Sequence, residues 1–168
     1  MNKLAKRIFS VLIAVMLCVP YVSFGACGKG GGDSKTDNDQ SDIQSFYDKV
    51  VESQQCLDAL ADDIYSYWYD AIYNNKYSGN INIAIASALS DNSENLAVVK
   101  ANDNTIKSLY KVVKSSDFSA EVKAVMSSYS DYYELVVNVS GSFNSYSAEK
   151  ETLKKALASA LKNLQLEM

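Results

Sequence analysis

Proline, the residue that most strongly ends a helix, is absent after Pro20. The stretch without proline covers 148 of the 168 residues (168 − 20). Within this stretch, apolar residues recur at intervals of three and four, the period of an amphipathic helix. They fall in four runs: 43–72, 85–113, 122–143 and 153–164. Strand-like alternation never extends beyond a few residues. We therefore expect an all-α fold.

Short connections between long helical runs place successive helices antiparallel. The sequence predicts an elongated, antiparallel, up-and-down bundle of three long helices over residues 42–168, with the third helix kinked or broken near 140–147. Residues 140–147 are rich in Ser, Gly and Asn and favour a turn. However, a seven-residue apolar register continues from Val136 to Leu164, interrupted only by Lys150. A kinked third helix and a four-helix arrangement both stay open, and the continuous register weighs towards the kink.

The apolar runs also suggest how the helices align. We expect Ile43 to lie level with Val113 in an antiparallel pair, and Val113 level with Val122. This alignment surrounds Trp68 with three residues: Ala88, Phe143 and Tyr146. It also brings a set of polar and tyrosine residues to one level of the bundle: Ser53, Gln54, Asn102, Asp103, Tyr132 and Tyr133. We expect a half-buried polar layer there, in which tyrosine hydroxyls bond to Asp103 and Gln54 and fix the helix register.

The first 26 residues have the three parts of an export signal. Residues 1–7 carry three basic side chains and no acid, and residues 8–19 are almost wholly apolar. Pro20 and the small residues Gly25-Ala26 follow. A membrane-spanning helix, the rival interpretation, needs ~20 apolar residues, more than residues 8–19 provide. We expect residues 1–26 to be a signal peptide.

The segment Val22-Ser23-Phe24-Gly25-Ala26-Cys27 resembles the lipobox of bacterial lipoproteins. The resemblance implies that Cys27 receives a diacylglyceryl group and becomes the new N-terminus. Phe24 departs from the family, which usually has Leu there, and ordinary cleavage after Ala26 is the alternative. Two acyl chains anchor a protein stably. The resemblance thus implies a lipid-anchored protein of the cell membrane that faces the outside of the cytoplasm. The rest of the chain is similar in layout to small helical lipoproteins, but it resembles no specific family.

Residues 27–41 consist mainly of Gly, Asp, Ser, Lys, Asn and Gln. Such a composition buries too little apolar surface to order itself. We expect a flexible tether between the lipid anchor and the bundle.

Charge and composition exclude several kinds of function. Loss of the signal peptide would leave 13 Lys (16 − 3), no Arg and 20 acidic residues, a net charge of −7. This balance argues against nucleic-acid binding, which needs a basic surface. The chain has no histidine, the commonest general base and metal ligand, and Cys56 therefore has no imidazole to activate it. We expect no enzymatic activity, no metal and no cofactor.

Aromatic residues are densest between Tyr65 and Tyr77, where six occur within 13 residues. They point all round a helix, so they cannot all face one core. We expect Ile64, Trp68 and Ile72 to fill the core. The tyrosines either form the rim of that core or make an exposed binding patch. The candidate patch consists of Tyr65, Tyr69, Tyr73 and Tyr77. The expected function is a non-enzymatic interaction protein of the cell envelope, with a protein partner at this aromatic-rich end; the alternative is binding of a glycan or small ligand around Trp68.

Overall fold

The computed structural model describes residues 34–168. The expected signal peptide, the lipidation site Cys27 and the first part of the expected tether lie outside the described residues. The described chain is all-helical. Its elements are α2 (Ser34–Tyr73), the 3₁₀ turn η1 (Lys76–Gly79), α3 (Ile81–Asp91), α4 (Ser93–Val113), α5 (Ser119–Val137) and α6 (Phe143–Glu167).

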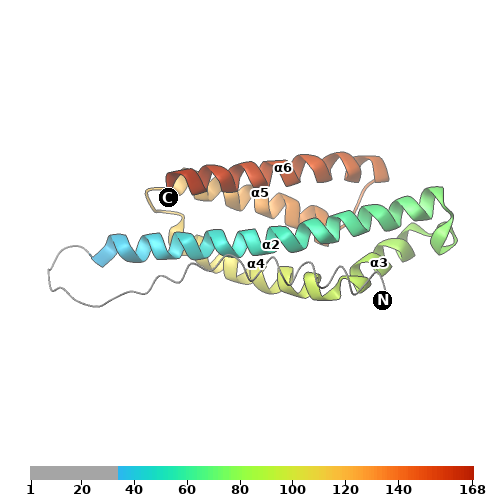
Figure 1. The fold of residues 1–168 in the computed structure, drawn as a ribbon, viewed down its shortest axis with the longest axis horizontal. Helices are drawn as coiled ribbons and strands as arrows, with labels where there is room; N and C mark the ends of the chain where they lie inside the picture. The colour runs from blue at the N-terminus through green and yellow to red at the C-terminus, as the bar shows by residue number, and fades with distance from the viewer. Residues whose placement is uncertain (1–33) are drawn as a thin grey trace, which may run out of the picture. The chain divides into compact units, whose positions relative to one another are not determined.

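The long helix α2 organises the bundle, because it contacts each of the other elements. Figure 1 shows α4 running back along α2, and α5 and α6 forming an antiparallel pair on the other side. The C-terminus lies beside the first part of α2, since the Gln40 side chain donates to the Met168 carbonyl oxygen at 3.3 Å. Helix α2 begins at Ser34, eight residues before the expected start at 42 (42 − 34). Residues 34–39 contain two acidic residues and one lysine, and acidic residues favour the N-terminal end of a helix.

The expected second helix is two helices, because the chain breaks at Asn92. Asn92 has non-helical backbone angles (φ −111°, ψ 28°) between α3 and α4. Its side chain donates to Asp63 of α2 at 2.8 Å and to the Ala88 carbonyl oxygen at 3.0 Å. These bonds fix the break against α2.

The expectation of a single kinked third helix is wrong: the chain reverses direction between α5 and α6 (Figure 1). Gly141 adopts a φ of 85°, which only glycine reaches without strain. Ser142 and Ser145 then form a reciprocal capping box at the start of α6. The seven-residue register nevertheless holds within α6, and Lys150, the polar residue in it, is buried.

Most of the expected core and the alignment of the first two runs are confirmed. The Phe46 and Tyr110 rings lie 6.4 Å apart, each three residues from the expected pair Ile43 and Val113. Trp68 is 3% exposed and packs on Tyr146, with ring centroids 5.6 Å apart. Other fully buried side chains come from every long helix: Val50, Leu57, Ile64, Ile106, Val125, Leu157 and Leu164.

The expected polar layer exists, but its bonding differs from the expectation. Ser53, Asn102 and Asp103 are buried. Asp103 accepts from Lys107 at 2.7 Å, one turn along the same helix, and not from a tyrosine. Tyr132 donates instead to Asp58 at 2.8 Å. The sequence indicated which residues are buried but not their partners, because a rotation of α5 by a fraction of a turn changes which hydroxyl meets which carboxylate.

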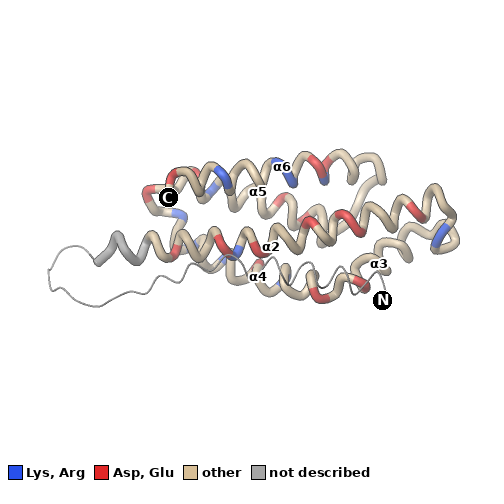
Figure 2. The backbone as a smooth tube through the Cα atoms, in the orientation of Figure 1, with Lys and Arg blue, Asp and Glu red and all other residues tan. Residues whose placement is uncertain are grey.

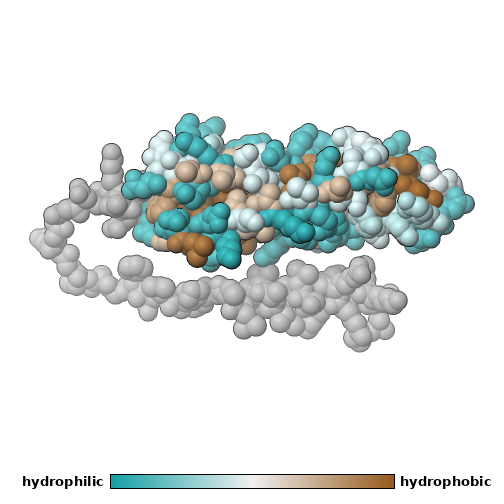
Figure 3. Space-filling view, turned by 90° about the horizontal axis from the view of Figure 1, so that it is seen from above, coloured by the Kyte–Doolittle hydropathy of each residue, from teal (hydrophilic) through white to brown (hydrophobic). Residues whose placement is uncertain are grey.

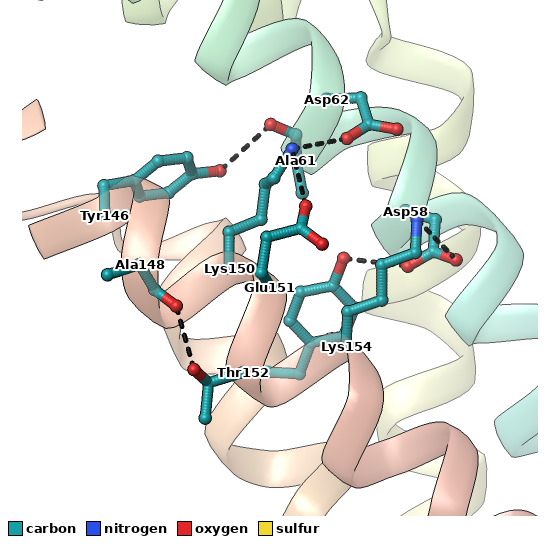
Figure 4. Close-up of polar contacts among 10 residues, drawn as sticks. Asp58, Ala61, Asp62, Tyr146, Ala148, Lys150, Glu151, Thr152 and Lys154 are labelled. Carbon is teal, nitrogen blue, oxygen red and sulfur yellow. Dashed lines mark hydrogen bonds and ion pairs between the residues drawn. The ribbon is translucent and has the colours of Figure 1, made fainter. Parts of the chain in front are cut away.

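Charged side chains join α2 to α6 in a seam shown in Figure 4. The Lys150 amine reaches Asp62 at 2.7 Å and Glu151 at 3.4 Å, and Lys154 lies 3.3 Å from Asp58. Burial lowers the pKa of Lys150, but the hydrogen bond and charge of Asp62, together with Glu151, outweigh it and raise the pKa overall. The seam holds α6 along the half of α2 that carries the aromatic residues.

Candidate functional site

The solvent-facing stripe of α2 changes character along the helix. Exposed positions recur at helical spacing and are first polar or small: Glu52, Gln55, Ala59, Asp62 and Ser66. The last exposed positions before the helix ends are Tyr69, Ile72 and Tyr73. A surface helix ordinarily keeps this stripe polar. The last turns of α2 therefore present aromatic and aliphatic side chains to solvent.

Tyr65, Tyr69 and Tyr73 of α2 gather around Phe143, the first residue of α6; we name these four residues the aromatic ladder. The Tyr65 ring stacks on Phe143 at a centroid distance of 5.1 Å. The Tyr69 and Tyr73 rings lie 6.2 and 6.1 Å from Phe143 and 4.6 Å from each other. Trp68 packs beneath, 5.9 Å from Phe143. The ladder therefore has a buried aromatic base and an open outer side.

Exposure increases towards the end of the ladder. Tyr65 and Phe143 are half-buried, whereas Tyr69 is 42% and Tyr73 59% exposed. Ile72 is also 42% exposed, so the expectation that it fills the core with Ile64 and Trp68 is wrong. It lies in the last turn of α2, where its side of the helix is not covered by a neighbour.

Tyr77 lies apart from the other three tyrosines of the expected patch. Its ring stacks on Tyr67, with centroids 5.6 Å apart and planes inclined by 19°. The Tyr67 hydroxyl donates to Asp91 at 2.6 Å. That hydrogen bond, together with burial and the nearby carboxylates, raises the pKa of Tyr67. The expected four-tyrosine patch thus divides into the ladder and a separate Tyr67–Tyr77 pair.

The turn between α2 and α3 has left-handed backbone at several non-glycine residues. Asn75, Tyr77 and Ser78 have φ values of 52°, 57° and 55°, and Gly79 has 70°. Such conformations cost of order 1 kcal/mol or more for a residue with a side chain. Lys76 in this turn pairs with Asp70. Hydrogen bonds from Lys76 and from Asn74 lower the pKa of Asp70.

The end of the bundle formed by the last turn of α2, η1 and α3 is almost free of charge; we name residues 69–90 the tip. Between residues 71 and 90, Lys76 is the single charged residue, and it is paired with Asp70. In Figure 2, the tube of α3 is tan, the colour of residues without charge, over most of its length. Five of the seven exposed large hydrophobic residues of the described chain lie between 69 and 83. In Figure 3, apolar residues reach the surface at the right-hand end, where the tip lies.

The described residues offer little for other kinds of site. Within residues 34–168, no group of three or more His, Cys, Asp or Glu side chains is arranged to hold a metal ion. Cys56 is a half-buried free thiol, and burial together with the charge of Glu52 raises its pKa, which disfavours the reactive thiolate. None of the described helices is both long and apolar enough to cross a membrane.

Comparison with known proteins adds no constraint on the function: no protein-family model, no curated protein and no solved structure matches the chain.

Proposed function

We propose that the chain is a lipid-anchored protein of the bacterial cell envelope that binds a protein partner through the tip of its helical bundle. The lipobox resemblance at Cys27 supports the anchor, and the proposed location is the membrane surface outside the cytoplasm. Attachment through two acyl chains needs no membrane-spanning helix. The proposed role is binding, without catalysis.

The observation that carries the proposed partner is the concentration of exposed apolar side chains at the tip. Tyr69, Ile72, Tyr73, Ile81 and Ile83 are between 37% and 59% exposed within 15 residues of sequence (69–83). The centre of a protein interface is typically depleted of charge and enriched in aromatic residues, and charged groups surround it. The tip has this composition.

The anchor is tested by metabolic labelling with an alkyne fatty acid in a bacterium that processes lipoproteins. We expect the wild-type chain to incorporate the label and Cys27→Ser to lose it. Cys18→Ser and Cys56→Ser are the matched controls and should label normally. Retention of label in Cys27→Ser would contradict the proposed anchor.

The partner is tested by site-specific photo-crosslinking in cells. A photoreactive amino acid replaces Tyr73 at the tip or Val112 at the other end of α4; both native side chains are 59% exposed, so the positions are matched in accessibility. We expect a discrete cross-linked product from position 73 and none from position 112. Equal products from both positions, or none from 73, would contradict a binding surface at the tip.

Glycan binding is the second candidate, favoured by the open Tyr73 ring, because an exposed aromatic face can stack on a sugar. Trp68 provides the readout, since it is the one tryptophan in the chain and contacts Phe143 of the ladder. A saturable change in tryptophan fluorescence on addition of purified cell-wall glycan, abolished by Tyr73→Ser, would favour this candidate over a protein partner.

A further inference from the structure

The charge of the bundle is unevenly distributed between its two ends. The half that ends in the tip comprises residues 57–98 and 132–155, with the boundary at the contacts of Asp58 with Tyr132 and Lys154. It contains four Lys and nine acidic residues, a net charge of −5. The rest of residues 40–168 contains seven Lys and eight acidic residues, a net charge of −1 (7 − 8). The apolar tip therefore lies at the acidic end.

Many of these carboxylates have no cationic partner within the described residues. Four of the nine pair with Lys76, Lys150 or Lys154. The other five form no ion pair within residues 40–168: Asp63, Asp91, Glu94, Glu134 and Glu149. Asp63 and Asp91 lie on the α2–α3 side, next to the tip. The apolar surface thus has two carboxylates without a cationic partner beside it, Asp63 and Asp91, and we name these two residues the acidic rim.

The aromatic ladder already binds one cation of its own chain. The Lys150 amine lies 4.8 Å from the centre of the Tyr65 ring and 2.7 Å from Asp62. A cation held on an aromatic face beside a carboxylate is a favourable arrangement. Tyr69 and Tyr73 continue the ladder by one and two helical turns, and within the described residues no lysine amine lies over either ring. Their exposed faces are open to a cation from outside.

We propose that the tip binds a cationic amphipathic segment of a partner protein, whose apolar side covers the tip and whose Lys or Arg residues reach the Tyr69 and Tyr73 rings and the acidic rim. This proposal rests on the proposed function and deepens it. Charge complementarity selects the occupant. A second copy of this chain would bring two acidic ends together, and an anionic membrane surface would repel the same end.

The test uses the full chain and two dye-labelled 14-residue model peptides, one of Leu and Lys and one of Leu and Glu, with fluorescence anisotropy as readout. We expect the Leu/Lys peptide to bind and the Leu/Glu peptide to bind at least about tenfold more weakly. The affinity for the Leu/Lys peptide should fall as salt is raised from low to physiological concentration, because the rim charges are exposed.

Matched variants separate specific docking from general attraction to an acidic protein. Tyr69→Ser with Tyr73→Ser should weaken binding of the Leu/Lys peptide about tenfold, since exposed aromatic anchors dominate such contacts. Val112→Ser with Leu166→Ser alters the other two exposed large hydrophobic residues, 59% and 72% exposed, and should leave binding unchanged. Circular dichroism checks that each variant is folded.

Three outcomes would overturn the inference: equal binding of both peptides, equal weakening by the two double variants, or self-association that Tyr73→Ser abolishes in sedimentation. The photo-crosslinking experiment separates these failures from failure of the proposed function. A partner captured at position 73 that contacts the tip through an uncharged or acidic segment would leave the binding function intact and refute the cationic one.

Discussion

Two buried tyrosines of α5 provide a matched test of the bonding inside the bundle. Tyr129 and Tyr132 both have fully buried rings, less than one helical turn apart in the chain. The Tyr132 hydroxyl donates to Asp58 at 2.8 Å. The Tyr129 hydroxyl is buried and makes no hydrogen bond of normal geometry within residues 40–168, although Ser53 is near enough to influence its pKa. Replacement of each by Phe removes one oxygen and leaves the ring.

The two replacements should have opposite signs. A hydrogen bond to a charged group contributes about 1.5–3 kcal/mol, and the Asp58 side chain is 27% exposed, so Tyr132→Phe should destabilise by ~1.5 kcal/mol. An unbonded buried hydroxyl costs free energy in the folded state. Tyr129→Phe removes that cost and should stabilise the protein by up to ~1 kcal/mol.

Urea unfolding of the full chain, followed by circular dichroism and by the fluorescence of Trp68, measures both free energies. The midpoint should fall for Tyr132→Phe and rise for Tyr129→Phe, with the slope of the transition unchanged. If Tyr129→Phe were as destabilising as Tyr132→Phe, the reasoning would be refuted. A bond between Tyr129 and Ser53 would then be the explanation, and Ser53→Ala should reproduce the loss.

Three further predictions concern the turn, the seam and the response to alkaline pH. Ser78→Gly should stabilise the protein by ~0.5–1 kcal/mol, because φ is 55° at Ser78. Ser87→Gly, within α3, should destabilise the protein by a similar amount. Equal effects of the two substitutions in thermal unfolding would argue against a strained turn. Lys150→Met should change the free energy of unfolding by less than ~1 kcal/mol, because methionine replaces the buried methylene chain of the lysine. Lys150→Ala should lower it by at least ~2 kcal/mol. Equal losses for the two variants in urea unfolding would show that the charge of Lys150 dominates. Burial raises the pKa of Tyr129, Tyr132 and Tyr146 above the ordinary value near 10. The stability that these tyrosines contribute is therefore complete below about pH 10. Above that pH the free energy of unfolding falls by ~1.4 kcal/mol per pH unit for each group. Helix loss and tyrosinate absorbance should therefore rise together on alkaline titration, and full ionisation with the helices intact would contradict this.

The apolar period was sufficient to predict most of the core, because burial of one helix face leaves a direct mark on the sequence. Phe46 and Tyr110 meet in the register expected from the apolar runs alone. The break at Asn92 was not predicted, since no Pro or Gly marks it and the hydrogen bond that holds it is made to Asp63 on another helix. A continuous apolar register also hid the reversal before Phe143, because α6 resumes the same spacing in the opposite direction.

The candidate site was predicted in part. The aromatic density between Tyr65 and Tyr77 indicated the end of α2 where aromatic side chains are exposed, but not the exposure of Ile72 or the separation of Tyr77. Both depend on where neighbouring elements end, which side-chain periodicity does not record. The exposed isoleucines of α3 were also missed. The available signal was the absence of charge between residues 77 and 90, which is unusual for a helix on a protein surface.

The outermost part of the tip, residues 72–83, lies outside the core, and this has a consequence for how the sequence there can change. No residue between 72 and 83 is buried, and the turn η1 contributes nothing to the packed interior. Substitutions there should change the stability of the bundle less than substitutions in the core, as is usual for exposed turns. A change of sequence between residues 72 and 83 can therefore alter the proposed binding surface without rebuilding the scaffold that presents it.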